Sequence, residues 1–364
     1  MRSTNTLCLF IALSSLSLAC ADEPPGQDTP ELSTSWEQFR ANPPLRWETF
    51  RDSTEREPVA PYRYIVDGDI LLLTEDALRA HYEAWLEQEF RATTAGGSAL
   101  AVRWTGADVL WPAAQRNALT YCISNNFGAN KATLVAAMSR ATASWTARAA
   151  VTFTYVPAQD ATCTNTNNNV LFSVEPVNAT YFAAAFFPDA ARAQRQLLVT
   201  PAAFTTTSGG RDLEGILRHE TGHILGFRHE HIFINCVNFT ETTTDARQVT
   251  AYDVNSVMHY PQCRPSQAGG YRQSALDELG ATMLYGAPRT TECLFNWAQT
   301  NYPTLFAPAA TTAVSGNYVF RFYSGTNAYL GIDVTDQNVY YLPVGGTLQN
   351  QGPKATWLTT SGCN

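Results

Sequence analysis

The chain has 364 residues and a formal net charge of −8, so it is long enough for two domains and a sizeable core. A negative chain without a basic stretch lacks the electrostatic surface that nucleic-acid binding needs, and we expect no nucleic-acid partner. Beyond the N-terminal region, no apolar stretch is long enough to cross a bilayer.

The first 21 residues have the features of an export signal. An apolar run at residues 7–19 follows a positive charge and is too short to span a bilayer. Ala19, Cys20 and Ala21 fit a signal-peptidase site, which predicts a secreted, extracellular protein. An alternative stays open, because the LSLAC run that ends in Cys20 resembles a bacterial lipobox. Lipid attached to Cys20 would then anchor the chain at the bacterial outer membrane.

The region before the first expected domain boundary has two parts. Residues 22–61 are rich in Pro, Glu, Asp and Thr, and we expect an extended segment that docks a few aromatic side chains. Residues 62–73 predict two strands with an Asp-Gly-Asp turn at 67–69, and residues 75–91 predict a helix with one apolar face. We place a domain boundary at the glycine-rich residues 95–98.

An alternation of strands and helices follows this boundary. Apolar patterns predict a long helix at 130–149 and strands at 118–123, 151–156, 170–174, 183–187 and 196–200. A helix from Asp212 to Leu225 comes next, and the Asp212 carboxylate favours its N-terminus through the helix dipole. A last helix is predicted at 274–284, with Ser274 as its cap and Asp277 at the third position.

The tail, residues 290–364, changes in composition and predicts a small antiparallel β unit. Strands are expected at 318–323, 329–334 and 339–344, with turn residues between them. Many aromatic side chains lie in this tail. They either fill a small core or form a platform for carbohydrate or protein, and the size of the unit favours the first interpretation.

Six of the eight cysteines lie beyond the export signal, and an even number in an exported chain indicates disulfides. The sequence does not choose among their connectivities. We expect both members of each pair to lie within one proposed unit of the chain. The expected pairs are Cys122–Cys163, Cys236–Cys263 and Cys293–Cys363.

The run HETGHILGFRHEH, which begins at His219, holds four of the six histidines. On a helix, His219 and His223 present two imidazoles on one face, with Glu220 beside them. Gly226 can take a positive φ and turn the chain back, so that His229 reaches the same ion. Three neutral imidazoles with an open position favour a catalytic zinc site over a closed structural one.

A second motif, SVMHY, lies at residues 256–260. A zinc helix followed by a methionine turn is the metzincin signature, and these two motifs resemble the astacin family of zinc endopeptidases. The element order over residues 99–289 resembles the metzincin catalytic domain, an α+β fold with a mixed five-stranded sheet. By this resemblance Met258 is the floor beneath the metal and Tyr260 a movable fifth ligand. The alternatives are an ordinary core methionine and a half-buried, hydrogen-bonded tyrosine.

The resemblance implies a zinc-dependent endopeptidase acting on protein or peptide substrates. Glu220 is the expected general base, which takes a proton from the zinc-activated water and passes it to the leaving amine. Tyr260 would move off the zinc and assist at the oxyanion. An extended substrate would pair with an edge strand, which we expect at Ala183–Phe187.

The resemblance also implies a zymogen with residues 22–98 as its propeptide. Astacin-like propeptides carry a Phe-x-Gly-Asp motif whose Asp binds the zinc, and this chain matches it up to Asp69, with valine in place of the aromatic residue. Asp69 is therefore the expected latch, although Asp67 or an ordinary hairpin turn is an alternative. By resemblance Glu230 pairs with the mature N-terminal amine, which we expect between residues 93 and 101. The alternative for Glu230 is a solvent-facing charge.

Two other functions stay open. An aminopeptidase with Glu as third ligand is disfavoured because His229 stands at that position. A binding or adhesion protein on an inactive metzincin scaffold is disfavoured because Glu220 is present. We expect a monomer, and residues 290–364 resemble the small accessory modules of bacterial exported proteins.

Overall fold

The computed structural model describes residues 40–41, 43, 45–57, 62–92, 101–207, 210–234, 236, 240–264, 270–308 and 311–363. The chain divides into two units, Met1–Ala41 and Asn42–Asn364, and every element discussed below belongs to the second. The export signal, the lipobox cysteine and most of the expected activation region lie outside the described residues. None of the helices that the structure describes is long and apolar enough to cross a membrane.

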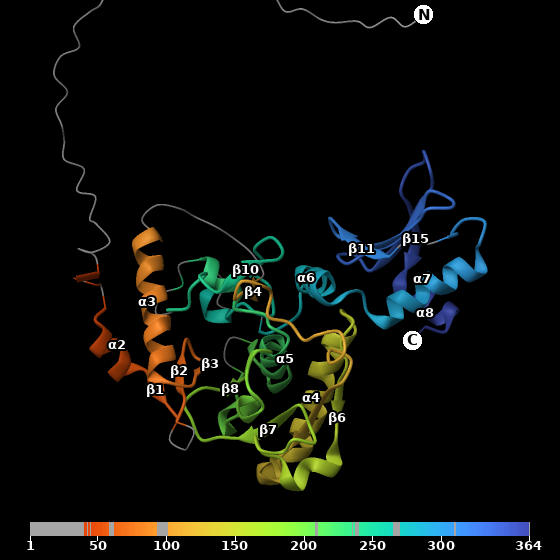
Figure 1. The fold of residues 1–364 in the computed structure, drawn as a ribbon. Helices are drawn as coiled ribbons and strands as arrows, with labels where there is room; N and C mark the ends of the chain where they lie inside the picture. The colour runs from red at the N-terminus through yellow and green to blue at the C-terminus, as the bar shows by residue number, and fades with distance from the viewer. Residues whose placement is uncertain are drawn as a thin grey trace, which may run out of the picture. The chain divides into compact units, whose positions relative to one another are not determined.

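The N-terminal segment combines two helices with a three-stranded antiparallel sheet (Figure 1). Its elements are α2 (Trp47–Ser53), β1 (Glu55–Arg56), β2 (Tyr64–Val66), β3 (Ile70–Leu72) and α3 (Glu75–Ala92). The expectation of an extended segment is wrong for α2. Its Phe50 is buried 5.4 Å from the ring of Tyr82 on α3, so a tertiary contact stabilises a helix that composition does not predict.

The central sheet has five strands in the order β6-β5-β7-β9-β8. These strands are β5 (Leu119–Ile123), β6 (Phe153–Tyr155), β7 (Phe172–Pro176), β8 (Ala183–Ala184) and β9 (Gln196–Val199). The first four in this order are parallel, and β8 pairs antiparallel with β9 at the edge. The expected α+β class and mixed five-stranded sheet are confirmed, and the expected edge strand is shorter than predicted.

Helices α4 (Lys131–Thr146) and α5 (Leu213–Ile224) contribute to one apolar core with this sheet. Trp145 of α4 joins the two helices, because its indole Nε1 donates to the backbone oxygen of Arg218, 2.9 Å away on α5. Asp212 caps α5 by accepting a hydrogen bond from the backbone nitrogen of Gly215 at 2.6 Å. The core therefore fixes α5 against the sheet.

Helix α6 (Ala275–Tyr285) begins with the expected capping box. The Ser274 hydroxyl accepts from the backbone nitrogen of Asp277, and the Asp277 carboxylate accepts from the backbone nitrogen of Ser274. Two further strands, β4 (Ala101–Arg103) and β10 (Ala246–Gln248), pair antiparallel and form a separate sheet. Strand β4 precedes the central sheet in the chain, and β10 follows the histidine motif.

The C-terminal part forms a five-stranded antiparallel meander with two helices. Its elements are α7 (Arg289–Asn301), β11 (Thr312–Ser315), β12 (Tyr318–Tyr323), β13 (Ala328–Asp333), β14 (Asn338–Leu342), β15 (Gln349–Pro353) and α8 (Lys354–Ser361). The three expected strands are confirmed as β12 to β14. Strands β11 and β15 and helices α7 and α8 were not predicted. Strand β15 is polar and mostly exposed and therefore has no apolar alternation, whereas Phe295 of α7 reaches the core of the meander.

All three expected disulfides are present, namely Cys122–Cys163, Cys236–Cys263 and Cys293–Cys363. The second one links the segment after the histidine motif to the segment after the methionine turn. The third closes the C-terminal part by joining α7 to the chain end.

Candidate metal centre

Helix α5 presents the first two histidines from one face, one turn apart. His219 Nδ1 lies 2.8 Å from the backbone oxygen of Val257, and His223 Nδ1 lies 2.7 Å from that of Phe227. A carbonyl oxygen only accepts, so both Nδ1 atoms carry the proton and both Nε2 atoms keep a free lone pair. Both side chains are buried, and each is oriented as a metal ligand.

Gly226 turns the chain after α5 and brings the third histidine to the first two. Its φ is +95°, and a Cβ at this position would lie 2.3 Å from the backbone oxygen of Val109, so only glycine fits. After this turn, His229 Nε2 lies 3.1 Å from His219 Nε2 and 3.2 Å from His223 Nε2. The structure thus brings the three predicted ligands together.

Asp69 of the N-terminal segment completes the group. Its carboxylate oxygens lie 3.2 Å from Nε2 of His219, 3.2 Å from Nε2 of His229 and 3.8 Å from Nε2 of His223. Tetrahedral zinc with bonds of about 2.0–2.1 Å separates its ligand atoms by roughly 3.3 Å. The four buried side chains fit a zinc ion in both spacing and ligand chemistry.

The protonation of this cluster depends on burial and on two nearby carboxylates, those of Asp69 and Glu241. Burial lowers the pKa of His219 to about 4. For His229 burial also opposes protonation, but the carboxylates of Asp69 and Glu241 outweigh it and raise the pKa to about 10. A metal-free cluster therefore keeps a proton on His229, which an incoming metal ion must displace.

Glu220 is buried next to the cluster, as the motif predicts for a base. Its pKa is raised well above the ordinary value, first by burial and then by the negative charge of Asp69. Among the residues that the structure describes, no hydrogen-bond partner is found for its Oε2. The contribution of Asp69 to the raised pKa of Glu220 would disappear when Asp69 leaves the cluster.

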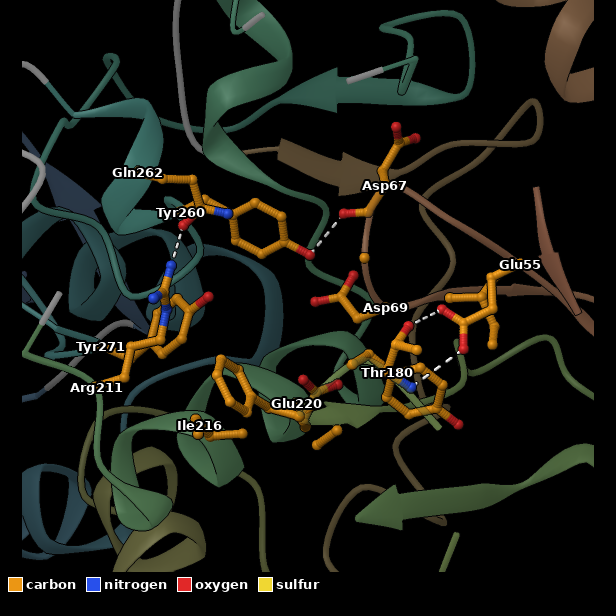
Figure 2. A pocket seen from close by; sticks show the side chains of 15 residues that line it. Glu55, Asp67, Asp69, Thr180, Arg211, Ile216, Glu220, Tyr260, Gln262 and Tyr271 are labelled. Atoms are coloured by element: carbon orange, nitrogen blue, oxygen red, sulfur yellow. Dashed lines mark hydrogen bonds between the residues drawn. The ribbon is translucent and has the colours of Figure 1, made fainter. Parts of the chain in front are cut away.

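Met258 and Tyr260 both belong to the predicted methionine turn and have different contacts. Met258 is completely buried, and its backbone oxygen accepts from the backbone nitrogen of Glu230 at 3.0 Å. The Tyr260 ring centroid lies 4.4 Å from that of His229, but its hydroxyl donates to the backbone oxygen of Asp67 at 2.9 Å (Figure 2). The Asp69 carboxylate lies within 3.8 Å of all three imidazole Nε2 atoms, while the Tyr260 hydroxyl binds the backbone of Asp67.

Two other residues of the motifs have clear positions. His259 Nε2 lies 2.8 Å from the Tyr252 hydroxyl, and His259 is not part of the metal group. Glu230 is fully buried, so the solvent-facing alternative is wrong. Its Oε1 accepts from the backbone nitrogen of Asp253 at 2.7 Å, and burial raises its pKa to about 9.

A pocket of about 320 Å³ opens beside this cluster, lined by both the N-terminal segment and the central domain (Figure 2). Its lining residues include Asp69, Glu220, Tyr181 and Tyr271. Ile70 forms a parallel β-bridge with Ala185, directly after edge strand β8. The N-terminal segment thus occupies the edge at which we expect an extended substrate to pair.

Two buried carboxylates near the cluster, Asp277 and Glu241, were not predicted as site residues. Asp277 accepts from Ser256 Oγ at 2.7 Å and from the backbone nitrogen of Val257 at 2.8 Å, and so connects α6 to the methionine turn. Glu241 contacts Nδ1 of His229. Glu241 belongs to no motif, and the sequence predicts Asp277 only as part of the cap of α6; tertiary packing brings each of them to the site.

Residues 111–260 match the family model described as Matrixin (Peptidase_M10). The match includes the three histidines, Glu220 and the methionine turn, and the three histidines belong to the buried metal-binding group. Together they support a metzincin zinc metalloprotease. Matrixins are a different metzincin family from the astacins, which the two motifs resemble. A comparison with curated proteins found no match.

Proposed function

We propose that this metalloprotease is a secreted, zinc-dependent endopeptidase made as a zymogen, with an astacin-like active site. The observation that carries the proposal is the convergence of three imidazole Nε2 atoms, with His229 within 3.2 Å of both others and Glu220 buried beside them. The catalytic domain spans residues 99–289. Residues 290–364 are an accessory module, and anchoring through lipid on Cys20 remains the alternative to free secretion.

When bound, zinc would polarise the substrate carbonyl and lower the pKa of the attacking water. Glu220 takes the proton from that water and delivers it to the leaving amine. Tyr260, once its hydroxyl is released from Asp67, donates a hydrogen bond to the developing oxyanion. Edge strand β8 pairs with the extended backbone of the substrate and sets its position.

The N-terminal segment blocks each of these steps at once. Asp69 stands where the water would be, and the backbone of Asp67 holds the Tyr260 hydroxyl. Ile70 takes the place of substrate beside the edge strand at Ala185. Residues 22–98 therefore act as an inhibitory propeptide, with Asp69 as the latch.

The buried position of Glu230 supports a second step of activation, in which this residue forms an ion pair with a new N-terminus. A fully buried carboxyl group with a pKa of about 9 is neutral in the zymogen. An ammonium group arriving beside it would ionise it and form a buried ion pair. We propose that the new N-terminal amine, created by cleavage between residues 93 and 101, is this partner.

The proposal is tested by expressing the full chain, removing its propeptide and measuring casein digestion by the product. We expect activity that a chelator abolishes and zinc restores, and that Glu220→Ala removes while zinc still binds. The rival interpretation, a binding protein on an inactive scaffold, predicts stoichiometric zinc without digestion. N-terminal sequencing of the active form would locate the cleavage site and test the role of Glu230.

A further inference from the structure

The third histidine is oriented differently from the first two. His219 and His223 each direct Nδ1 to a neutral backbone oxygen, whereas His229 directs Nδ1 to the carboxylate of Glu241. Glu241 is buried, so its charge acts on the imidazole with little screening by water. A carboxylate on the second nitrogen of a metal-binding histidine fixes the ring and makes the first nitrogen a stronger ligand.

Arg228 holds this carboxylate in place. Its Nε lies 2.7 Å from Glu241 Oε1, and its Nη1 contacts Asp245. Arg228 is itself buried, so the pair compensates two charges that would be costly to bury alone. One oxygen of Glu241 thus serves Arg228 and the other serves His229.

The grouping of His229, His231 and Glu241 has the ligand types of a second metal site. The surroundings disfavour a cation there. The Arg228 guanidinium already lies 2.7 Å from Glu241, and a metal ion beside it would meet this positive charge at close range. Glu241 therefore serves the first site.

The N-terminal segment binds the same loop, residues 240–245, that carries Glu241. Asp67 Oδ1 accepts from both the backbone nitrogen of Thr240, at 2.5 Å, and its hydroxyl, at 3.1 Å. Gln88 Oε1 accepts in the same way from the backbone nitrogen of Thr243, at 2.7 Å, and its hydroxyl, at 3.1 Å. Two side chains of the propeptide thus bind the loop at Thr240 and Thr243, on either side of Glu241.

We propose that Glu241 is a positioning residue for His229, and that loop 240–245 couples the propeptide to the metal site. The propeptide then stabilises the zinc site in two ways, directly through Asp69 and indirectly through the loop that orients His229. The proposal rests on the zinc site of the proposed function and extends it to the loop.

The first test measures zinc affinity by competition with a chelator, in the full chain carrying Glu220→Gln so that it cannot digest itself. Glu241→Gln and Glu241→Asp should each weaken zinc binding about 10- to 100-fold. Asp160→Asn is the control, because Asp160 is a buried carboxylate that pairs with Lys131 and lies outside both the metal group and loop 240–245. We expect a much smaller effect for this control.

Thermal unfolding separates positioning from a structural role. If Glu241 only supports the fold, its substitution lowers the midpoints of the metal-free and zinc-loaded chains equally. If it positions His229, the rise in midpoint caused by zinc becomes smaller. Absence of zinc binding in the parent chain would contradict the proposed function, whereas zinc binding unchanged by both Glu241 variants would overturn the positioning role alone.

The coupling is tested in a chain that also carries Asp69→Asn, which removes the direct contact of the propeptide with the metal. In this background Gln88→Ala should weaken zinc binding about fivefold, the low end of the range for coupled sites. Asp76→Ala, at an exposed position on the same helix α3, is the control and should have no effect. Equal zinc affinity in the Gln88 and Asp76 variants would overturn the coupling.

Discussion

Gly222 of α5 packs directly on Met258 of the methionine turn. A Cβ at position 222 would lie 2.3 Å from Met258 Sδ and 3.2 Å from Cζ2 of Trp145, closer than real Cβ contacts. The zinc helix and the methionine turn can therefore approach each other only because this position has no side chain. The contact supports the helix that carries two of the predicted ligands.

Gly222→Ala should therefore destabilise the protein, although alanine favours helix formation by about 1 kcal/mol. Overpacking of a buried site costs about 1–3 kcal/mol, so we expect a net loss of about 1 kcal/mol in the free energy of unfolding. In a Met258→Ala background the space is open, and the same substitution should be neutral or stabilising. Denaturant unfolding of the four chains measures this coupling. If Gly222→Ala lowers the free energy of unfolding equally with Met258 and with Ala at position 258, the clash is with Trp145 and not with Met258.

Asp69→Ala should produce activity before the propeptide is removed, because within the part of the chain that the structure describes no other carboxylate groups with all three histidines. Asp67→Ala is the informative comparison. Its carboxylate faces Thr240 and His81, so its removal should release much less activity. Hydrolysis of a fluorogenic peptide by uncleaved chains provides the measurement. An Asp69 variant that is as silent as the parent chain would rule out the latch.

Tyr260→Phe removes a hydroxyl that has a different partner in each proposed state. In the mature enzyme we expect kcat to fall about 100-fold with little change in KM, as for loss of one oxyanion donor. In the zymogen the substitution removes the hydrogen bond to the backbone oxygen of Asp67 and should speed propeptide release. Unchanged kcat would show that another group stabilises the oxyanion.

Asp277 predicts a specific pH dependence of stability. Burial raises its pKa to about 6, against an ordinary value of 3.8, despite hydrogen bonds that favour the ionised form. Between these values the folded chain binds a proton that the unfolded chain has lost, so stability falls as pH rises from about 4 to about 6 and is level above. The difference corresponds to about 3 kcal/mol.

Asp277→Asn is the matched control for this effect, because it keeps the shape and cannot ionise. As pH rises from 4 to 6, the thermal midpoint of the parent chain should fall relative to that of this variant. A difference that stays constant over this range would mean that Asp277 does not titrate there.

Short-range patterns in the sequence predicted much of this protein. The i, i+4 spacing of His219 and His223, the glycine at 226, the cap at Ser274 and the strands around the sheet depend on local geometry, and the structure has them. The disulfide pairs followed from grouping cysteines by unit. Helix α2 and strand β15 were missed because their stability comes from neighbours and not from their own periodicity.

Only the tertiary structure decided which distant groups meet at the metal centre. Glu241 lies outside any motif and Asp277 was predicted only as a helix-cap residue, yet one contacts His229 and the other holds the turn at Val257. The sequence likewise left open whether Asp69 or Asp67 faces the histidines, and the hairpin geometry places Asp69 there. The physical reason is range: backbone periodicity and turn chemistry act over a few residues, whereas the partners of a buried charge are selected by packing across the whole fold.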